Sequence, residues 1–372
     1  MKELLKAAAL FALLLAAIPM LTFIKPRDGI SPPLTAEAAG LSNGVRNAAA
    51  KKTAAPAGEA DTAGTALPDS ADEPSKPDDT DNSDTLKVLD FTSGQVMELS
   101  LRDYVIGAVL AEMPASYHEE ALKAQAVAAR TYAVRQREKQ SLSPDPELMG
   151  ADISNDSTKY QAYFTPEQAK AFYGSGYEVY LEKASAAVDA TGSDVLIYEG
   201  EPIVAAFHST SGGKTESAEV VWGSPVDYLV PVDSSEDEKS PSYLEENTFT
   251  EAELKARLET ALEGTDFGGS PENWLDIKER SVSGTVTKMT AGGAELSGAD
   301  FRRIFSLRSA NFTVEYSENG GTFSVTTKGS GHGVGMSQYG ANAMANGGSD
   351  YKEILLHYYG GAEIADMNDI AY

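Results

Sequence analysis

The spacing of apolar residues after position 100 predicts a helix that ends at a proline. Apolar residues recur at helical intervals over Leu101–Met113 and are followed directly by Pro114. Proline lacks a backbone donor and disfavours helix at the residue before it, so the helix should end near Met113. Glu112 is therefore expected at the C-terminal end of this helix.

A second helix is expected immediately afterwards, from Glu119 to about Gln140. Ser116 precedes Glu119 by three residues, which is typical of a capping box at a helix start. The apolar stripe of this helix is rich in alanine and includes one polar residue, Gln125. A polar side chain on a buried face needs a hydrogen-bond partner, so Gln125 is a candidate for a structured site.

The remainder of the chain alternates between short strands, turns and short helices. Asn319-Gly320 between two apolar runs is a strong hairpin signal. There is no alternation of strand and helix of the kind that builds a parallel sheet, so we predict an α+β fold, with helices and hairpin-connected strands around a substrate groove. The expected strands are Leu86–Met97, Val195–Tyr198, Ile203–Phe207, Val282–Met289, Phe312–Tyr316 and Thr322–Thr327, and short helices are expected after Thr250 and Ser297.

The N-terminal region predicts a membrane anchor followed by a tether. Ala7–Ile24 contains 18 consecutive uncharged, mostly apolar residues, long enough for a spanning helix. We therefore expect a single-pass anchor at residues 1–25, a flexible linker at 26–86 and a folded domain at 87–372 outside the cytoplasm. The alternative is a cleaved signal peptide, for which Ala36-Glu37-Ala38 resembles a cleavage site.

The amino-acid composition argues against several classes of function and site. The chain has 372 residues with 56 acidic and 30 basic side chains, giving a formal net charge of −26. An acidic balance argues against a nucleic-acid partner. The absence of cysteine excludes disulfides and thiolate metal ligands.

Glu112 is the leading candidate for chemistry. A carboxylate at the negative end of a helix dipole, among apolar neighbours, holds its proton more tightly than usual. That property suits a proton donor. The alternative is an ordinary solvated carboxylate at a helix end.

Two polar, glycine-rich segments are candidate binding loops. His208–Glu216 leaves a predicted strand and carries hydroxyls and two glycines, which allow backbone to approach a ligand closely. Gly329–Gly340 lacks the signature of a phosphate loop and fits sugar hydroxyls better. The alternative interpretation of each segment is an ordinary structural turn. Trp222 is a better sugar-stacking candidate than Trp274.

Two other chemistries receive little support. Ser209 beside His208 would point to the opposite face of a strand, which disfavours a nucleophilic pair. The four histidines show no clustered spacing, so we predict no metal and no cofactor.

Four segments together resemble the stage II sporulation protein D family, whose domain also occurs in amidase enhancers. The resemblance covers roughly residues 87–365, nearly all of the expected domain. The matching segments are Tyr104–Pro114, Ala121–Tyr132, His208–Glu216 and Gly331–Gly340, with Tyr358-Tyr359-Gly360.

This resemblance implies a lytic transglycosylase that cleaves the MurNAc–GlcNAc bond of peptidoglycan strands already stripped of stem peptides. Glu112 maps onto the family's catalytic acid. Some relatives hold a metal through cysteine, which this chain lacks. Residues expected to contact sugar or to orient Glu112 are Gln125, Arg130, His208, Ser211, Gly212, Gly213, Thr215, His332 and Gln338.

The resemblance also implies a setting for this activity. Family members act in the septal or engulfing cell membrane during engulfment of the forespore, with a membrane-anchored amidase/endopeptidase and an integral membrane partner. Two alternatives remain: a glycan-binding amidase enhancer without catalysis, and a muramidase that hydrolyses the same bond.

Overall fold

The computed structural model describes residues 85–370. The expected anchor at 1–25 and nearly all of the expected linker at 26–86 lie outside these residues. Across 85–370, no helix combines the length and apolar character needed to cross a bilayer.

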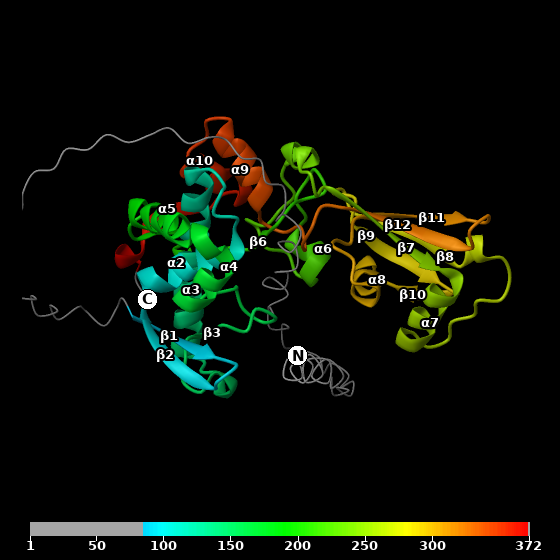
Figure 1. Ribbon diagram of the computed structural model, residues 1–372, viewed down its shortest axis with the longest axis horizontal. Helices are drawn as coiled ribbons and strands as arrows, with labels where there is room; N and C mark the ends of the chain where they lie inside the picture. The colour runs from blue at the N-terminus through cyan, green and yellow to red at the C-terminus, as the bar shows by residue number, and fades with distance from the viewer. Residues whose placement is uncertain (1–84, 371–372) are drawn as a thin grey trace, which may run out of the picture. The chain divides into compact units, whose positions relative to one another are not determined.

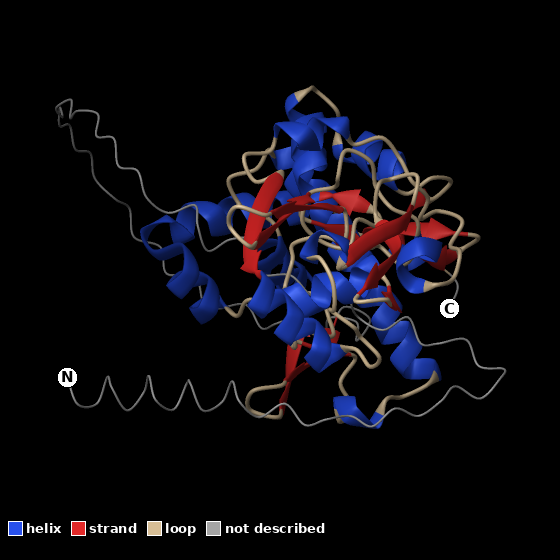
Figure 2. Cartoon of the chain, turned by 90° about the vertical axis from the view of Figure 1, so that its right-hand side faces the viewer, coloured by secondary structure: helices blue, strands red, loops and turns tan. Residues whose placement is uncertain are grey.

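The described chain mixes helices and short sheets, which confirms the α+β class (Figures 1 and 2). Its α-helices are α2 (Leu101–Glu112), α3 (Glu119–Leu142), α4 (Pro166–Tyr173), α5 (Tyr177–Ala190), α6 (Ala218–Trp222), α7 (Glu251–Ala261), α8 (Gly298–Phe305), α9 (Gln338–Asn346) and α10 (Tyr351–Tyr358).

The strands form small sheets rather than one large one. They are β1 (Thr85–Asp90), β2 (Gln95–Ser100), β3 (Ile153–Ser154), β4 (Asp194–Tyr198), β5 (Glu201–Pro202), β6 (Phe207–His208), β7 (Leu244–Thr250), β8 (Leu275–Arg280), β9 (Val286–Ala291), β10 (Ala294–Leu296), β11 (Phe312–Ser317), β12 (Thr322–Lys328), β13 (Met336–Ser337) and β14 (Glu363–Asp366). The sheet orders are β2-β1-β3, β14-β4-β5, β13-β6, β10-β9-β8 and β11-β12-β7.

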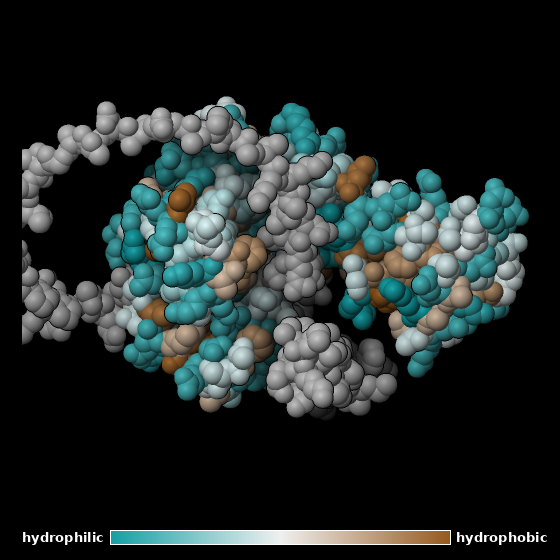
Figure 3. Space-filling model, in the orientation of Figure 1, coloured by the Kyte–Doolittle hydropathy of each residue, from teal (hydrophilic) through white to brown (hydrophobic). Residues whose placement is uncertain are grey.

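Two separate apolar cores organise these elements. The larger core surrounds α2 and α3, onto which α5, α9 and α10 pack. The smaller core lies within residues 244–328, which we call the β-lobe, where β7–β12 enclose aromatic side chains against α7 and α8 (Figure 1). The surface shown in Figure 3 is mostly hydrophilic, and its hydrophobic residues form small separate patches. Trp274 lies in the β-lobe core beside Phe267 and Phe323, so its size serves packing.

The helix ends at the centre of the larger core are set by local signals. Ser100 caps α2 by accepting a hydrogen bond from the Asp103 backbone N–H at 3.0 Å. Helix α2 ends at Glu112 as predicted, and Met113 before the proline is extended. The expected cap of α3 was wrong: His118, not Ser116, accepts from the Glu120 N–H through Nδ1 at 3.2 Å.

Several sequence expectations need correction. Leu86–Met97 was expected as one strand but folds back as β1 and β2, because a turn closed by the Gly94 N–H on Asp90 interrupts it. The strand expected at Val282–Met289 begins at Val286, since Ser281–Gly284 form a turn. Helices α4 and α5 were not expected at all. The hairpin β11–β12 is confirmed. Strand β4 also turns back as expected, but the strand predicted at Ile203–Phe207 was wrong: its partner β5 covers only Glu201–Pro202, because a tight turn from the Ala206 N–H to the Val204 carbonyl follows, and Phe207 belongs to β6.

Candidate active site

Glu112 occupies the last position of α2 and is half-buried. Burial raises the pKa of its carboxyl from 4.5 to about 7, and a hydrogen bond from the Ala162 backbone N–H to Oε1 opposes that rise. No basic residue lies in the last turn of α2 to neutralise the helix dipole. A carboxyl with a pKa of about 7 is present in both protonation states at neutral pH, as a group that donates and then accepts a proton requires.

The segment that supplies Ala162 lies directly on α2, and a glycine makes this approach possible. The Phe164 N–H donates to the Gly107 carbonyl at 3.2 Å. A Cβ at Gly107 would lie 2.3 Å from the Tyr163 ring and 2.6 Å from the Phe164 carbonyl oxygen. This segment was not predicted from the sequence, although Gly107 inside a helix is a signal for close approach of other backbone.

The side chain of Gln338 binds the backbone carbonyl of Glu112. Its Nε2 donates to the Glu112 carbonyl oxygen at 3.0 Å and to Gln125 Oε1 at 3.3 Å. Tyr173 caps a second carbonyl of the same helix end, donating to Leu110 O at 2.7 Å. These contacts satisfy carbonyls that have no partner within α2 and fix the position of Glu112. The predicted residues Gln125 and Gln338 thus meet at Glu112.

The two glycine-rich segments come together through a short parallel pair of strands. Phe207 and His208 of β6 pair with Met336 and Ser337 of β13. Gly335, in the left-handed region at φ 72°, allows this approach, since a Cβ there would lie 2.0 Å from the Ala206 carbonyl oxygen. The pairing places the His208–Glu216 segment beside the loop that leads into Gln338.

A buried carboxylate that the sequence analysis did not single out ties these segments together. Asp237 accepts hydrogen bonds from the Ser211 N–H at 2.8 Å and from the hydroxyls of Ser234 and Ser337 at 2.9 Å each. Burial raises the pKa of Asp237, while these hydrogen bonds lower it. Asp237 therefore holds the backbone of Ser211 and the side chain of Ser337, which directly precedes α9.

His208 is buried and neutral. Its Nδ1 lies 3.1 Å from the Val334 carbonyl oxygen, which can only accept, so Nδ1 carries the proton. Burial, followed by the neighbouring His332, lowers the pKa of His208 to about 3. The two rings lie 5.7 Å apart, and Trp222 packs on His332 at 5.8 Å. The candidate stacking residue Trp222 is therefore next to the histidine pair.

Three other predicted site residues, Arg130, Thr215 and Gly213, make contacts that stabilise the fold. Arg130 is buried and donates to the carbonyls of Asp194 at 2.9 Å and Val188 at 3.3 Å, which ties α3 to β4 and α5. Thr215 is fully buried, and its Oγ1 accepts from the Val232 N–H at 2.9 Å. The Gly213 carbonyl accepts from the Ser234 N–H at 3.1 Å. None of these contacts involves Glu112.

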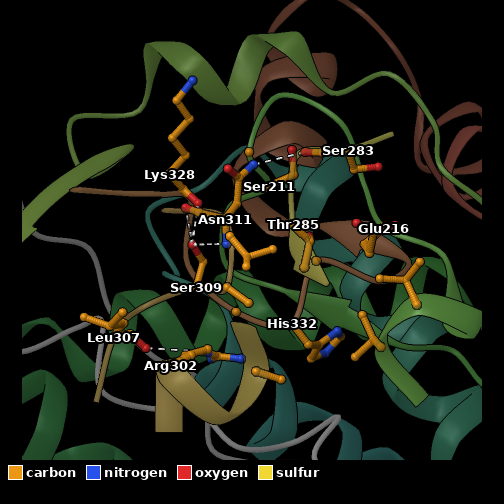
Figure 4. A pocket seen from close by; sticks show the side chains of 18 of the residues that line it. Ser211, Glu216, Ser283, Thr285, Arg302, Leu307, Ser309, Asn311, Lys328 and His332 are labelled. Atoms are coloured by element: carbon orange, nitrogen blue, oxygen red, sulfur yellow. Dashed lines mark hydrogen bonds between the residues drawn. The ribbon is translucent and has the colours of Figure 1, made fainter. Parts of the chain in front are cut away.

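A cavity of about 680 Å³ opens beside the histidine pair (Figure 4). Of the predicted residues, Ser211, Gly212 and His332 line it, whereas Glu112, Gln125 and Gln338 do not. Within residues 85–370, no group of three or more histidine, aspartate or glutamate side chains is arranged to hold a metal ion.

Comparison with known proteins identifies the family. The chain is 41% identical to stage II sporulation protein D of Bacillus amyloliquefaciens over 284 residues, which cover 76% of this chain and 79% of that protein. The chain belongs to the stage II sporulation protein D family. Its counterpart in Bacillus subtilis (strain 168) is also 41% identical, over 74% of this chain and 78% of the relative.

Two further matches define how far this family likeness extends. The family model described as "Stage II sporulation protein" matches residues 91–198, which include Glu112, Gln125 and Ala162. The amidase enhancer of Bacillus subtilis (strain 168) is 28% identical over 69% of this chain and 40% of that protein. The family likeness thus extends to a protein named as an amidase enhancer.

Proposed function

We propose that this member of the stage II sporulation protein D family is a lytic transglycosylase that cleaves the MurNAc–GlcNAc bond of denuded peptidoglycan strands. The supporting observation is the environment of Glu112, a single carboxyl whose pKa is raised to about 7 by burial and whose backbone and side chain are both held in place. The family resemblance supplies the substrate.

The proposed reaction uses Glu112 twice. The protonated carboxyl donates its proton to the glycosidic oxygen as the bond to C1 of MurNAc breaks. The resulting carboxylate then accepts the proton of the C6 hydroxyl as O6 bonds to C1. No water is consumed, and the product carries a 1,6-anhydro end. A pKa near the working pH favours both transfers.

The electrostatic surroundings of Glu112 within residues 85–370 favour this route over hydrolysis. Glycosidases that hydrolyse typically use two carboxyl groups about 5–9.5 Å apart. Among the described residues, the pKa of Glu112 is set by burial and the Ala162 hydrogen bond, with no contribution from another acidic side chain. The carboxylate of Asp237, a buried acid, accepts three hydrogen bonds from serine residues.

Mass spectrometry of reaction products tests the proposal. Full-length protein in detergent is incubated with denuded strands and compared with Glu112→Gln, which should lose roughly 10²–10⁴-fold in rate because it cannot donate a proton. Glu119→Gln is a matched control, since this exposed carboxylate begins the next helix. Anhydro ends that disappear only in Glu112→Gln support the proposal, and full activity of that variant refutes it.

The same experiment separates the two alternatives. Products heavier by one water would identify a muramidase. Strand binding without cleavage by any variant would favour the enhancer function, for which the 28% identity to an amidase enhancer is the supporting observation.

We further propose that the enzyme works during sporulation at the septal or engulfing membrane, anchored by residues 1–25. Its expected partners are a membrane-anchored amidase/endopeptidase, which would supply denuded strands, and an integral membrane protein. Membrane fractionation of full-length protein, compared with protein lacking residues 1–25, tests the anchor.

A further inference from the structure

Helix α4, which packs against α2, carries an exposed phenylalanine near its C-terminal end (Figure 1). Phe172 is 50% exposed, and among the phenylalanines of residues 85–370 only Phe91 is also exposed. The capping box of Thr165 and the proline at the first position fix the start of this helix. A single exposed ring needs no explanation by itself, so the surroundings of Phe172 decide what it can bind.

Phe172 is the outermost ring of a group of four aromatic side chains. Its ring centroid lies 5.3 Å from that of Phe164 and 4.9 Å from that of Tyr173, and Tyr173 lies 5.0 Å from Tyr180 of α5. These separations are typical of packed aromatic pairs, which are about 4.5–7 Å apart. We call these four residues the aromatic cluster. Its inner rings support Phe172 on one side, while the rest of the Phe172 ring is open to solvent.

The aromatic cluster is bonded to the backbone on both sides of Glu112. The Tyr173 hydroxyl donates to the carbonyl of Leu110 at 2.7 Å, and this residue lies about 3 Å before Glu112 along the helix axis. Burial raises the pKa of Tyr173 to about 12, and a hydrogen bond with the backbone of Ala115, just after the Glu112 turn, opposes that rise. The position of the cluster is therefore fixed relative to the end of α2.

A second connection between the cluster and Glu112 runs through Ala162. The Ala162 N–H donates to the Glu112 carboxyl, and Phe164 of the cluster follows two residues later. Two residues span at most about 7 Å. Phe172 thus lies on two short paths that start at Glu112, and a glycan strand bound at Glu112 can reach it within a few sugar rings.

The exposed part of Phe172 matches one face of a sugar ring in chemistry and in size. The pyranose rings of GlcNAc and MurNAc carry their polar substituents at the rim, so their faces consist of C–H groups. An aromatic side chain has roughly 200 Å² of surface, so the exposed half of Phe172 is about 100 Å². A stable protein interface buries about 800 Å² on each partner, so this surface fits one sugar ring better than a folded protein. Gln168, one helical turn earlier, is exposed and has an amide that can bind the hydroxyls at the rim.

We propose that Phe172 is a sugar-stacking residue for the strand that Glu112 cleaves, and that its exposed ring packs against the C–H face of one GlcNAc or MurNAc ring near the bond that breaks. This inference rests on the proposed function and adds a binding subsite to it. Tyr173 connects the subsite to the end of α2, so a strand held at Phe172 is also held relative to Glu112. The contact involves no charged group, so its strength should not depend on salt.

Binding of denuded strands by full-length Glu112→Gln protein tests the inference without turnover. Adding Phe172→Ala should weaken binding about fivefold to tenfold at low and at high salt, as expected for the loss of one aromatic contact. Adding Phe172→Leu should weaken it by a smaller factor, whereas Phe172→Trp should bind at least as tightly as phenylalanine, because its ring is larger. In protein that retains Glu112, Phe172→Ala should raise KM more than it lowers kcat, since the sugar is bound in both the ground state and the transition state.

Phe91→Ala is the matched control, because Phe91 is 60% exposed and lies in the turn between β1 and β2, outside the aromatic cluster. Phe172→Leu and Phe172→Trp guard against misfolding, since both keep an apolar side chain against the inner rings. Strand binding that is unchanged in Phe172→Ala, or that falls equally in Phe91→Ala, overturns the inference. Because binding is measured apart from cleavage, failure of the transglycosylase proposal would appear instead in the product analysis.

Discussion

Replacing Glu112 with glutamine should change protein stability as well as activity, because glutamine has nearly the same shape but cannot ionise. Burial raises the pKa of this carboxyl from 4.5 to about 7, so the folded state holds the proton more tightly than the unfolded state does. The group therefore costs no stability below about pH 4, and its cost grows as the pH rises from 4.5 to 7. At 1.36 kcal/mol per pKa unit, the cost approaches about 3 kcal/mol above pH 8.

Glu112→Gln should therefore be more stable than the wild type in alkaline solution and equally stable in acid. For a domain of this size, about 3 kcal/mol corresponds to a melting temperature higher by roughly 5–10 °C. Circular dichroism melts of full-length protein at several pH values between 4 and 9 measure this difference, with Glu119→Gln as the control. A difference that does not grow between pH 5 and pH 8 would refute the assignment of the raised pKa to burial of Glu112.

Further predictions concern the surroundings of this carboxyl. Turnover should fall about tenfold per pH unit above pH 7, as the protonated form of Glu112 is lost; a flat profile to pH 9 would contradict this. Gly107→Ala should cost about 1–3 kcal/mol of stability by overpacking, whereas Gly360→Ala, with nothing within 4 Å of the new Cβ, should be tolerated in thermal melts. Gln338→Ala should lower turnover about threefold to tenfold, since it loses hydrogen bonds worth about 0.5–1.5 kcal/mol, without altering the melting curve by more than a few degrees. Asp237→Asn should lower stability by about 1–3 kcal/mol in denaturant titrations, because an amide nitrogen cannot accept from the serine donors.

Local signals were sufficient to predict much of the fold. The proline after Glu112 and the Asn319-Gly320 turn each act within a few residues, and the elements that they delimit are present. Helices α4 and α5 were missed, although Thr165 and Gln168 form a capping box at the start of α4 and Pro166 occupies its first position. Both helices pack against α2.

The candidate site was predictable in its residues but not in their contacts. Glu112 and Gln338 were both selected from the sequence, yet the hydrogen bond between them joins positions 226 residues apart. Ala162 was not selected, because it contributes only a backbone N–H and its side chain carries no chemistry. Arg130 looked like a ligand contact, but its buried guanidinium binds backbone carbonyls, which only the tertiary structure shows.

The position of the β-lobe in the chain has a consequence for folding order. The lobe is a continuous insertion with its own core, while the parallel pair β6–β13 that flanks it joins residues 129 apart, such as His208 and Ser337. Closing so long a loop of disordered chain is entropically costly, and prior folding of the insertion brings the loop ends closer. The β-lobe is thus expected to form before the strand pair, and Gln338 reaches Glu112 only after that pair has closed. Cleaving activity would then appear only once the C-terminal segment has been synthesised and folded.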